Sequence, residues 1–227
     1  MTTNPAWPFS RSAAVLMLCA ATTLAACMSA PVRISDDRIA KILASPDRSP
    51  ADRANDARRK PQQMLAFIGV APGMRVLDMG AGGGYSTELL ARAVGPSGRV
   101  HAQNNPVSAE ARGRFEQRLK TASLTNTTLH EQPYASPVPP EIAPGSLDMV
   151  TFFFIYHDQG NPAVDRMRMN RAVFDALKPG GAYIIADHSG RPGTGFSEWN
   201  TVHRVEEAAL RREVEAAGFR LAASADF

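Results

Sequence analysis

A glycine-rich turn marks the place where this chain could hold a nucleotide-like ligand. Asp78 precedes Gly80, Gly82 and Gly84 at alternate positions. The apolar residues before this turn predict a buried strand, and the residues after it predict a helix, which together open an α/β nucleotide-binding unit. Glycine allows a sharp turn and a close approach of the backbone to a ligand. The start of the helix adds unpaired N–H groups, so the segment is suited to binding.

The spacing of these glycines distinguishes between possible ligands. A dinucleotide fingerprint, G-x-G-x-x-G/A, would end on Tyr85, and a phosphate-binding loop would need a lysine that the segment lacks. The pattern Asp-x-Gly-x-Gly-x-Gly resembles motif I of the class I S-adenosyl-L-methionine (SAM) methyltransferases. The resemblance implies SAM as the cofactor. The residues it implies at the cofactor are Asp78, Gly80, Ala81, Gly82, Gly84, Tyr85, Gln103 and Asn104.

The second predicted strand departs from the pattern of that family. Its end usually carries an acidic residue that binds the ribose hydroxyls, whereas this chain has Gln103, Asn104 and Asn105. An amide can still bond a diol, but without the help of a charge. We therefore expect a weaker ribose contact from Gln103 and Asn104.

Two histidine-containing pairs follow the ends of predicted strands. His157-Asp158 comes after the most apolar stretch, residues 147–154, and Asp187-His188 comes after residues 182–186. In open α/β sheets the ligand lies at these carboxyl ends. Methyl transfer needs an aligned nucleophile and, for an OH or NH acceptor, removal of a proton. Since histidine titrates near neutral pH, we predict His157 as the catalytic base, with Asp158 or His188 assisting.

Two other interpretations of these residues remain open. The histidines, together with His203, Asp158, Asp187 and Glu206, could hold a metal ion, because imidazole and carboxylate are common ligands. They could also be hydrogen-bonded residues that shape loops. We assign no metal ligand from the sequence.

Composition and charge limit the kinds of function. The 227 residues suffice for one domain with appendages, and 44% apolar residues support a real core. A net charge of +3 is too small to argue for nucleic acid. The basic clusters are interleaved with acidic or apolar residues, so we expect no nucleic-acid partner.

The N-terminus has the parts of a bacterial export signal. A charged start and a short apolar core lead to Leu24-Ala25-Ala26-Cys27, which resembles a lipobox. The resemblance implies a signal peptide over residues 1–26 and lipidation of Cys27. Because Met28 replaces the usual inner-membrane retention signal, it implies an outer-membrane anchor facing the periplasm.

The remaining chain predicts a doubly wound, Rossmann-like α/β domain. We expect a tether with a short helix over 27–50 and the methyltransferase domain over 51–227. Six strands are predicted, the last at 219–223, after a helix over 202–217; the usual seventh strand is expected to be missing. The helix over 51–60 alternates acidic and basic residues, which indicates a solvated helix or one that folds over the cofactor.

A second resemblance covers about residue 45 to the C-terminus. This part is similar to a group of bacterial predicted methyltransferases of unassigned substrate, in motif I, the Tyr-His-Asp sequence at 156–158 and the Asp-His-Ser sequence at 187–189. It implies methyl transfer by a membrane-anchored domain to an unidentified acceptor, either a small molecule or one of unknown class. The alternative is a non-catalytic lipoprotein that binds SAM or another small molecule. Two features favour that alternative. The second strand ends in amides, and the expected location is outside the cytosol, whereas SAM is made inside the cytosol.

Overall fold

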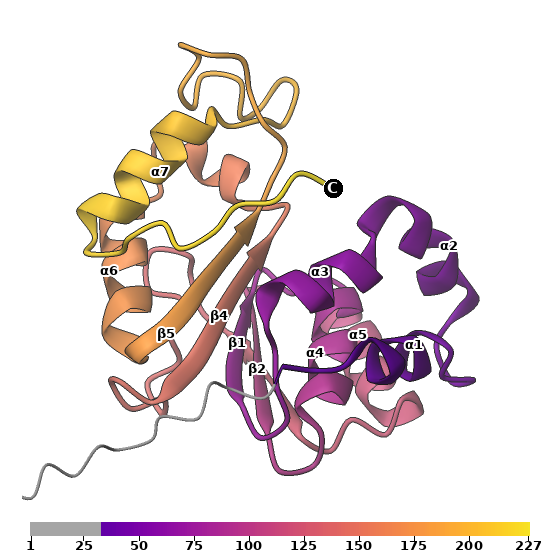
Figure 1. Ribbon diagram of the computed structural model, residues 1–227. Coiled ribbons are helices and arrows are strands. Elements are labelled where there is room, and N and C mark those ends of the chain that lie inside the picture. The colour runs from indigo at the N-terminus through magenta and orange to yellow at the C-terminus, as the bar shows by residue number, and fades with distance from the viewer. Residues whose placement is uncertain (1–32) are drawn as a thin grey trace, which may run out of the picture. The chain divides into compact units, whose positions relative to one another are not determined.

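The computed structural model describes residues 33–227, in which five parallel strands form one sheet (Figure 1). The strands are β1 (Arg75–Met79), β2 (Arg99–Asn104), β3 (Thr127–Glu131), β4 (Leu147–Phe153) and β5 (Leu177–Ala186). Their order across the sheet is β3-β2-β1-β4-β5. The order reverses at β1, so the carboxyl ends of β1 and β4 flank the switch point at which such sheets bind ligands. The predicted Rossmann-like class is confirmed.

Strands β1 and β4 are apolar on both faces because helices cover both sides of the sheet. Val76 belongs to one core cluster with Met149, and Leu77 belongs to a second cluster with Val150. The first face is covered by α1 (Asp36–Leu43), α3 (Pro61–Ile68) and α4 (Tyr85–Val94), and the second by α6 (Arg166–Ala176) and α7 (Glu207–Ala216). The remaining helices are α2 (Pro50–Arg59), α5 (Ala109–Thr121) and the short 3₁₀ helix η1 (Tyr156–Gly160).

Helix α1 is part of the folded unit. Its Ile39 and Ile42 are buried in the core with α3 and α4. Within the described residues, α1 therefore packs together with the predicted methyltransferase domain over 51–227. The predicted signal peptide and the lipidated Cys27 lie outside the described residues. Over residues 33–227, none of the helices combines the length and the apolar character that a membrane crossing requires.

Two predicted elements differ in the structure. Residues 219–223 form no strand, because Phe219 packs edge-on against Phe174 at 5.1 Å and beside Tyr183 at 5.4 Å instead of extending the sheet. The last helix begins at Glu207 rather than at residue 202. Its predicted first turn is replaced by an extended segment in which Val205 pairs with Ser189.

Candidate functional site

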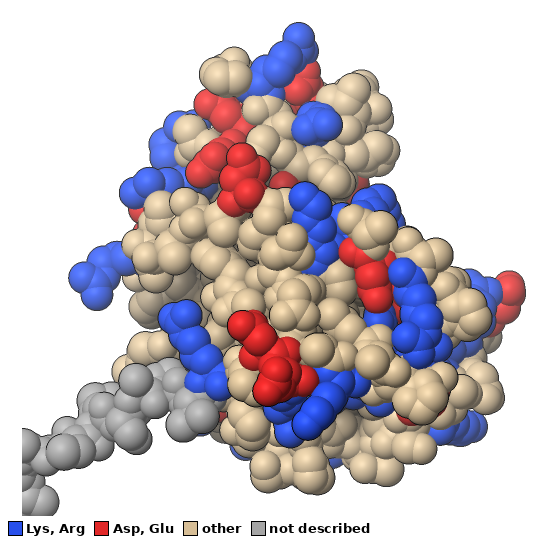
Figure 2. Space-filling view, turned by 45° about the vertical axis from the view of Figure 1, so that its right-hand side comes forward, with Lys and Arg blue, Asp and Glu red and all other residues tan. Residues whose placement is uncertain are grey.

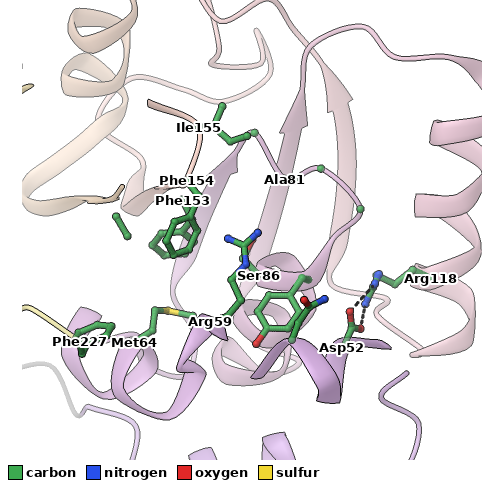
Figure 3. Close-up of a pocket in the computed structure, with 16 residues that line it drawn as sticks. Asp52, Arg59, Met64, Ala81, Ser86, Arg118, Phe153, Phe154, Ile155 and Phe227 are labelled. Atoms are coloured by element: carbon green, nitrogen blue, oxygen red, sulfur yellow. Dashed lines mark hydrogen bonds and ion pairs between the residues drawn. The ribbon is translucent and has the colours of Figure 1, made fainter. Parts of the chain in front are cut away.

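A cavity of about 320 Å³ lies between the glycine loop (residues 80–84) and helices α2 and α3 (Figure 3). Its wall combines three kinds of group. The glycine loop contributes backbone atoms, α2 and α5 contribute charged and polar side chains, and the carboxyl end of β4 contributes aromatic side chains. The residues used below are Asp52, Arg59, Met64, Gly82, Gly83, Arg118, Phe153, Phe154 and Phe227. Cavities of this size accommodate small-molecule ligands.

The glycines of the loop differ in what surrounds them. Gly84 has a φ of +86°, and a Cβ there would lie 2.9 Å from the Phe115 ring, so this position keeps α5 close. Gly82 also has a positive φ, at +55°, but its nearest neighbour is a backbone oxygen 3.9 Å away. A Cβ on Gly83 would meet nothing within 4 Å. The backbone at Gly82 and Gly83 therefore faces open space, as a ligand cradle requires.

Asp78 supports the loop from beneath and does not line the cavity. Its carboxylate is buried and accepts hydrogen bonds from Ser86 Oγ at 2.9 Å, Thr87 Oγ1 at 2.6 Å and Thr151 Oγ1 at 2.8 Å. Burial away from water raises the pKa of this carboxyl, and the three hydroxyl donors oppose that rise. Asp78 thus joins the start of α4 to β1 and β4.

Gln103 and Asn104 also bond to the loop itself. Gln103 Oε1 accepts from the Gly80 N–H at 3.1 Å, while Gln103 Nε2 donates to the Gln132 carbonyl at 2.6 Å. Asn104 accepts from the Gly82 N–H at 2.7 Å and donates to the Gly82 carbonyl at 3.1 Å. Both side chains are buried, and neither lines the cavity. An amide can donate and accept at once, which an acidic residue cannot do here.

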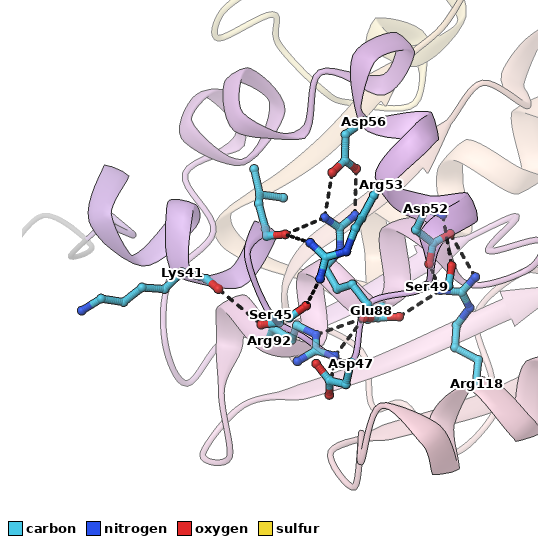
Figure 4. Close-up of polar contacts among 12 residues, drawn as sticks. Lys41, Ser45, Asp47, Ser49, Asp52, Arg53, Asp56, Glu88, Arg92 and Arg118 are labelled. Carbon is cyan, nitrogen blue, oxygen red and sulfur yellow. Dashed lines mark hydrogen bonds and ion pairs between the residues drawn. The ribbon is translucent and has the colours of Figure 1, made fainter.

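Helix α2 lines the cavity through Asp52 and Arg59, so one side of this charged helix is not solvated. Asp52 is buried and forms an ion pair with Arg118, which also reaches Glu88 at 2.9 Å (Figure 4). Burial and its hydrogen bond to Asp56, at 2.7 Å, raise the pKa of the Tyr85 hydroxyl. These contacts attach α2 to α4 and α5 across the glycine loop.

The opposite wall is aromatic. The guanidinium of Arg59 lies 4.3 Å from the centre of the Phe154 ring, within the range of a cation–π contact. Phe154 has a φ of +60°, a backbone conformation that is costly for a bulky residue and that clusters at functional sites. Phe153, Met64 and Phe227 complete an apolar surface beside it.

The predicted histidine residues gather at the ends of β4 and β5, next to the cavity. His157 Nδ1 lies 2.6 Å from Asp187 Oδ1, and His157 Nε2 lies 3.2 Å from Asp158 Oδ1. The ring centres of His157 and His188 are 6.2 Å apart. None of these residues lines the cavity, although their chain neighbours Ile155 and Ala186 do.

Sequence reasoning did not assign several cavity residues. Asp52, Arg59 and Arg118 lie on helices whose charges suit a solvated surface equally well. The pair between Asp52 and Arg118 joins α2 to α5 across 66 residues. Phe154 looked like the last residue of a buried strand. Its position two residues before the Tyr-His-Asp sequence at 156–158 was the one local feature that could have indicated a role at the site.

Comparisons with known proteins identify the class. A family model described as "Methyltransferase domain" matches residues 71–218, which is more than half of the chain. The chain belongs to this family. The membership confirms the predicted class, that of the SAM-dependent methyltransferases.

Individual relatives match only in part. The ubiquinone/menaquinone biosynthesis C-methyltransferase UbiE of Vibrio vulnificus is 29% identical over 121 residues, which are 53% of this chain and 44% of that protein. The match thus spans less than half the length of this relative. A protein-L-isoaspartate O-methyltransferase of Aeropyrum pernix is 52% identical over 40 residues, 18% of this chain and 15% of that protein.

Solved structures support the fold. A SAM-dependent methyltransferase from Aquifex aeolicus has a TM-score of 0.61 at 20% identity, covering 84% of this chain and 92% of that one. A geranyl diphosphate C-methyltransferase from Streptomyces coelicolor has a TM-score of 0.52 at 18% identity, covering 78% and 66%.

Proposed function

We propose that this protein transfers the methyl group of SAM to an acceptor bound at the ends of β4 and β5. The observation that carries the proposal is the open backbone of Gly82 and Gly83 in the wall of a ligand-sized cavity. Family membership supplies the reaction class, and the cavity supplies a place for the cofactor.

The residues around the cavity fit SAM in charge and shape. The cofactor carries a carboxylate and an aromatic base, and the wall offers the guanidinium of Arg59, the backbone of the glycine loop and the Phe154 ring. When bound, SAM supplies a methyl group on an already activated sulfonium. The protein must then align the acceptor and exclude water from the reaction. The apolar side chains of Met64 and Phe153 line the cavity and suit the exclusion of water.

We assign the acceptor side to the cluster that contains His157, Asp158 and His188. These residues follow strands that the sheet holds rigidly, and the neighbouring Ile155 and Ala186 reach the cavity. The class of acceptor is open. The names of the relatives include both a C-methyltransferase and an O-methyltransferase.

The test measures SAM binding and turnover separately. Calorimetric titration of the full chain with SAM and with S-adenosylhomocysteine should give saturable binding, and transfer of the radiolabelled methyl group should follow with a suitable acceptor. Folded protein that binds neither ligand would contradict the proposal. Binding without transfer to any of a broad set of acceptors would favour the alternative, a non-catalytic binding lipoprotein.

We further propose that Cys27 carries a lipid that anchors the protein to the outer membrane, facing the periplasm. The support is the Leu-Ala-Ala-Cys sequence after a short apolar run. Cys27→Ser should move the protein from the membrane fraction to the soluble fraction. A Cys27→Ser protein that has lost residues 1–26 and still sediments with membranes would contradict this anchor, and Cys19→Ser serves as the control.

A further inference from the structure

We propose that His157, Asp158 and His203 form a binding site for a divalent transition-metal ion, with Asp187 orienting His157. Each of the three residues offers one ligand atom, and all three atoms lie within 4.8 Å of one another. Asp158 Oδ1 is 3.2 Å from His157 Nε2 and 3.3 Å from His203 Nδ1. Ligands that are each about 2.0–2.2 Å from one ion have such separations, so small adjustments would complete the site.

The contacts of His157 leave one ring nitrogen available to a cation. Asp187 accepts from the His157 backbone N–H at 2.7 Å, from the His188 N–H at 2.7 Å, and lies 2.6 Å from His157 Nδ1. The contact with Asp187 occupies Nδ1 and fixes the direction of the ring. The other ring nitrogen, Nε2, lies 3.2 Å from Asp158 Oδ1, so two atoms of the kinds that commonly bind metal ions face each other.

The arrangement matches the way proteins prepare histidine ligands. A ligating histidine commonly donates its other ring N–H to a carboxylate, which sets the tautomer and the direction of the ring. The side chains of His157 and Asp187 are almost fully buried, at 5% and 4% exposure, so this pair is rigid. Asp158 and His203 are more exposed, at 41% and 62%, which leaves a path for an ion from solvent.

The backbone brings His203 to the cluster from a distant part of the chain. His203 has a φ of +54°, an uncommon conformation for a residue other than glycine. Two hydrogen bonds fix the segment beyond it, from the Val205 N–H to the His188 carbonyl at 3.1 Å and from the Gly190 N–H to the Val205 carbonyl at 2.8 Å. The His203 ring consequently stands edge-on to His157, with 5.4 Å between their centres.

The ligand set indicates the kind of metal. Two imidazoles and one carboxylate suit Zn²⁺, Co²⁺ or Fe²⁺ better than Mg²⁺ or Ca²⁺, which prefer oxygen ligands alone. Three protein ligands also leave a coordination position for water or for an acceptor molecule. The site shares His157 and Asp158 with the cluster assigned to the acceptor, and it shares no residue with the wall of the SAM cavity, so metal binding and SAM binding can be tested separately.

Cobalt is the probe, because a Co²⁺ ion with few ligands absorbs visible light whereas hydrated Co²⁺ absorbs weakly. Full-length protein stripped with a chelator should bind one Co²⁺, with a saturable visible band that added Zn²⁺ removes. His203→Ala and Asp158→Asn should abolish the band. Asp187→Asn should weaken Co²⁺ binding about 10–100-fold, the usual effect of losing a carboxylate behind a histidine ligand. His188→Ala is the matched control and should bind Co²⁺ like the wild type.

Two results would overturn the site. One is a Co²⁺ band that survives both His203→Ala and Asp158→Asn. The other is a nitrogen NMR spectrum in which His157 carries two ring protons in metal-free protein and does not change when Zn²⁺ is added. His203 and Asp158 are exposed enough for their variants to fold, and thermal unfolding without metal checks this. Calorimetry with SAM on the same variants separates failure of the metal site from failure of the proposed methyl transfer.

Discussion

Replacing Gly83 with valine separates the binding role of the glycine loop from its folding role. A Cβ at Gly83 meets no atom within 4 Å, and this residue is not among the glycines with positive φ. The free energy of unfolding should therefore stay within about 1 kcal/mol of wild type, since a compatible glycine replacement restricts the unfolded chain. The new side chain would stand in the space that the cofactor needs.

The expected loss of affinity follows from overpacking. Forcing extra methyl groups into a close contact typically costs about 1–3 kcal/mol, which corresponds to SAM binding about 5- to 150-fold weaker. Gly83→Ala should give a smaller loss in the same direction. The graded effect would identify contact at this position, because a general disturbance of the loop would not scale with side-chain size.

Gly84→Ala is the control for folding. Gly84 has a φ of +86°, and its added Cβ would lie 2.8 Å from Arg118 Cδ and 2.9 Å from Phe115 Cε2. The left-handed backbone costs about 1–2 kcal/mol and the overlap about 1–3 kcal/mol. Together they should lower the Tm by roughly 4–20 °C.

The assay combines calorimetry with SAM and thermal unfolding for each variant. Gly83→Val should lose affinity with a wild-type Tm, and Gly84→Ala should lose Tm. A stably folded Gly83→Val protein with wild-type SAM affinity would refute the assignment of this wall to the cofactor.

Two further predictions concern residues behind the loop. Gln103→Glu should lower the free energy of unfolding by about 1–3 kcal/mol, because a carboxylate oxygen would replace the Nε2 that donates to the Gln132 carbonyl. Chemical denaturation measures this loss. Tighter SAM binding at unchanged stability would instead support a ribose contact by this side chain. Burial, with a smaller effect of His130, lowers the pKa of His101 to about 4, below the 6.5 of an ordinary histidine. Between these pH values the folded state binds fewer protons than the unfolded state, so the free energy of unfolding should fall as the pH drops from 6.5 to about 4. Urea titrations at several pH values measure this dependence, and His101→Phe should make it weaker. An unchanged pH dependence in His101→Phe would contradict the prediction.

The elements near the binding loop could be predicted from local sequence. The apolar run before Asp78 can be buried only in a strand covered on both faces, and the alternating glycines exclude a regular element at the turn. The short helix expected within 27–50 is α1, which follows from the apolar spacing of Ile39 and Ile42. Short-range preferences determine these features, so neither partner strands nor ligands were needed to infer them.

The predictions that failed concern segments whose neighbours decide their structure. Phe219 lies in a run that suits a strand, but its ring packs against Phe174 and Tyr183, and the backbone gains no partner strand. The segment around His203 suits a helix, but pairing of Val205 with Ser189 keeps it extended. In both cases contacts formed across the fold outweigh a weak local preference.

The sequence by itself determined the class of the protein, because the strand, the glycine loop and the helix are all encoded between Arg75 and Val94. The tertiary structure decided what the individual side chains do. It alone turns Gln103 and Asn104 toward the loop and pairs Asp52 with Arg118. It also brings His203 to His157 across 46 residues of chain, through the bridge between Ser189 and Val205. Such pairings depend on the distances between strands and loops in the folded sheet, which no local pattern of residues specifies.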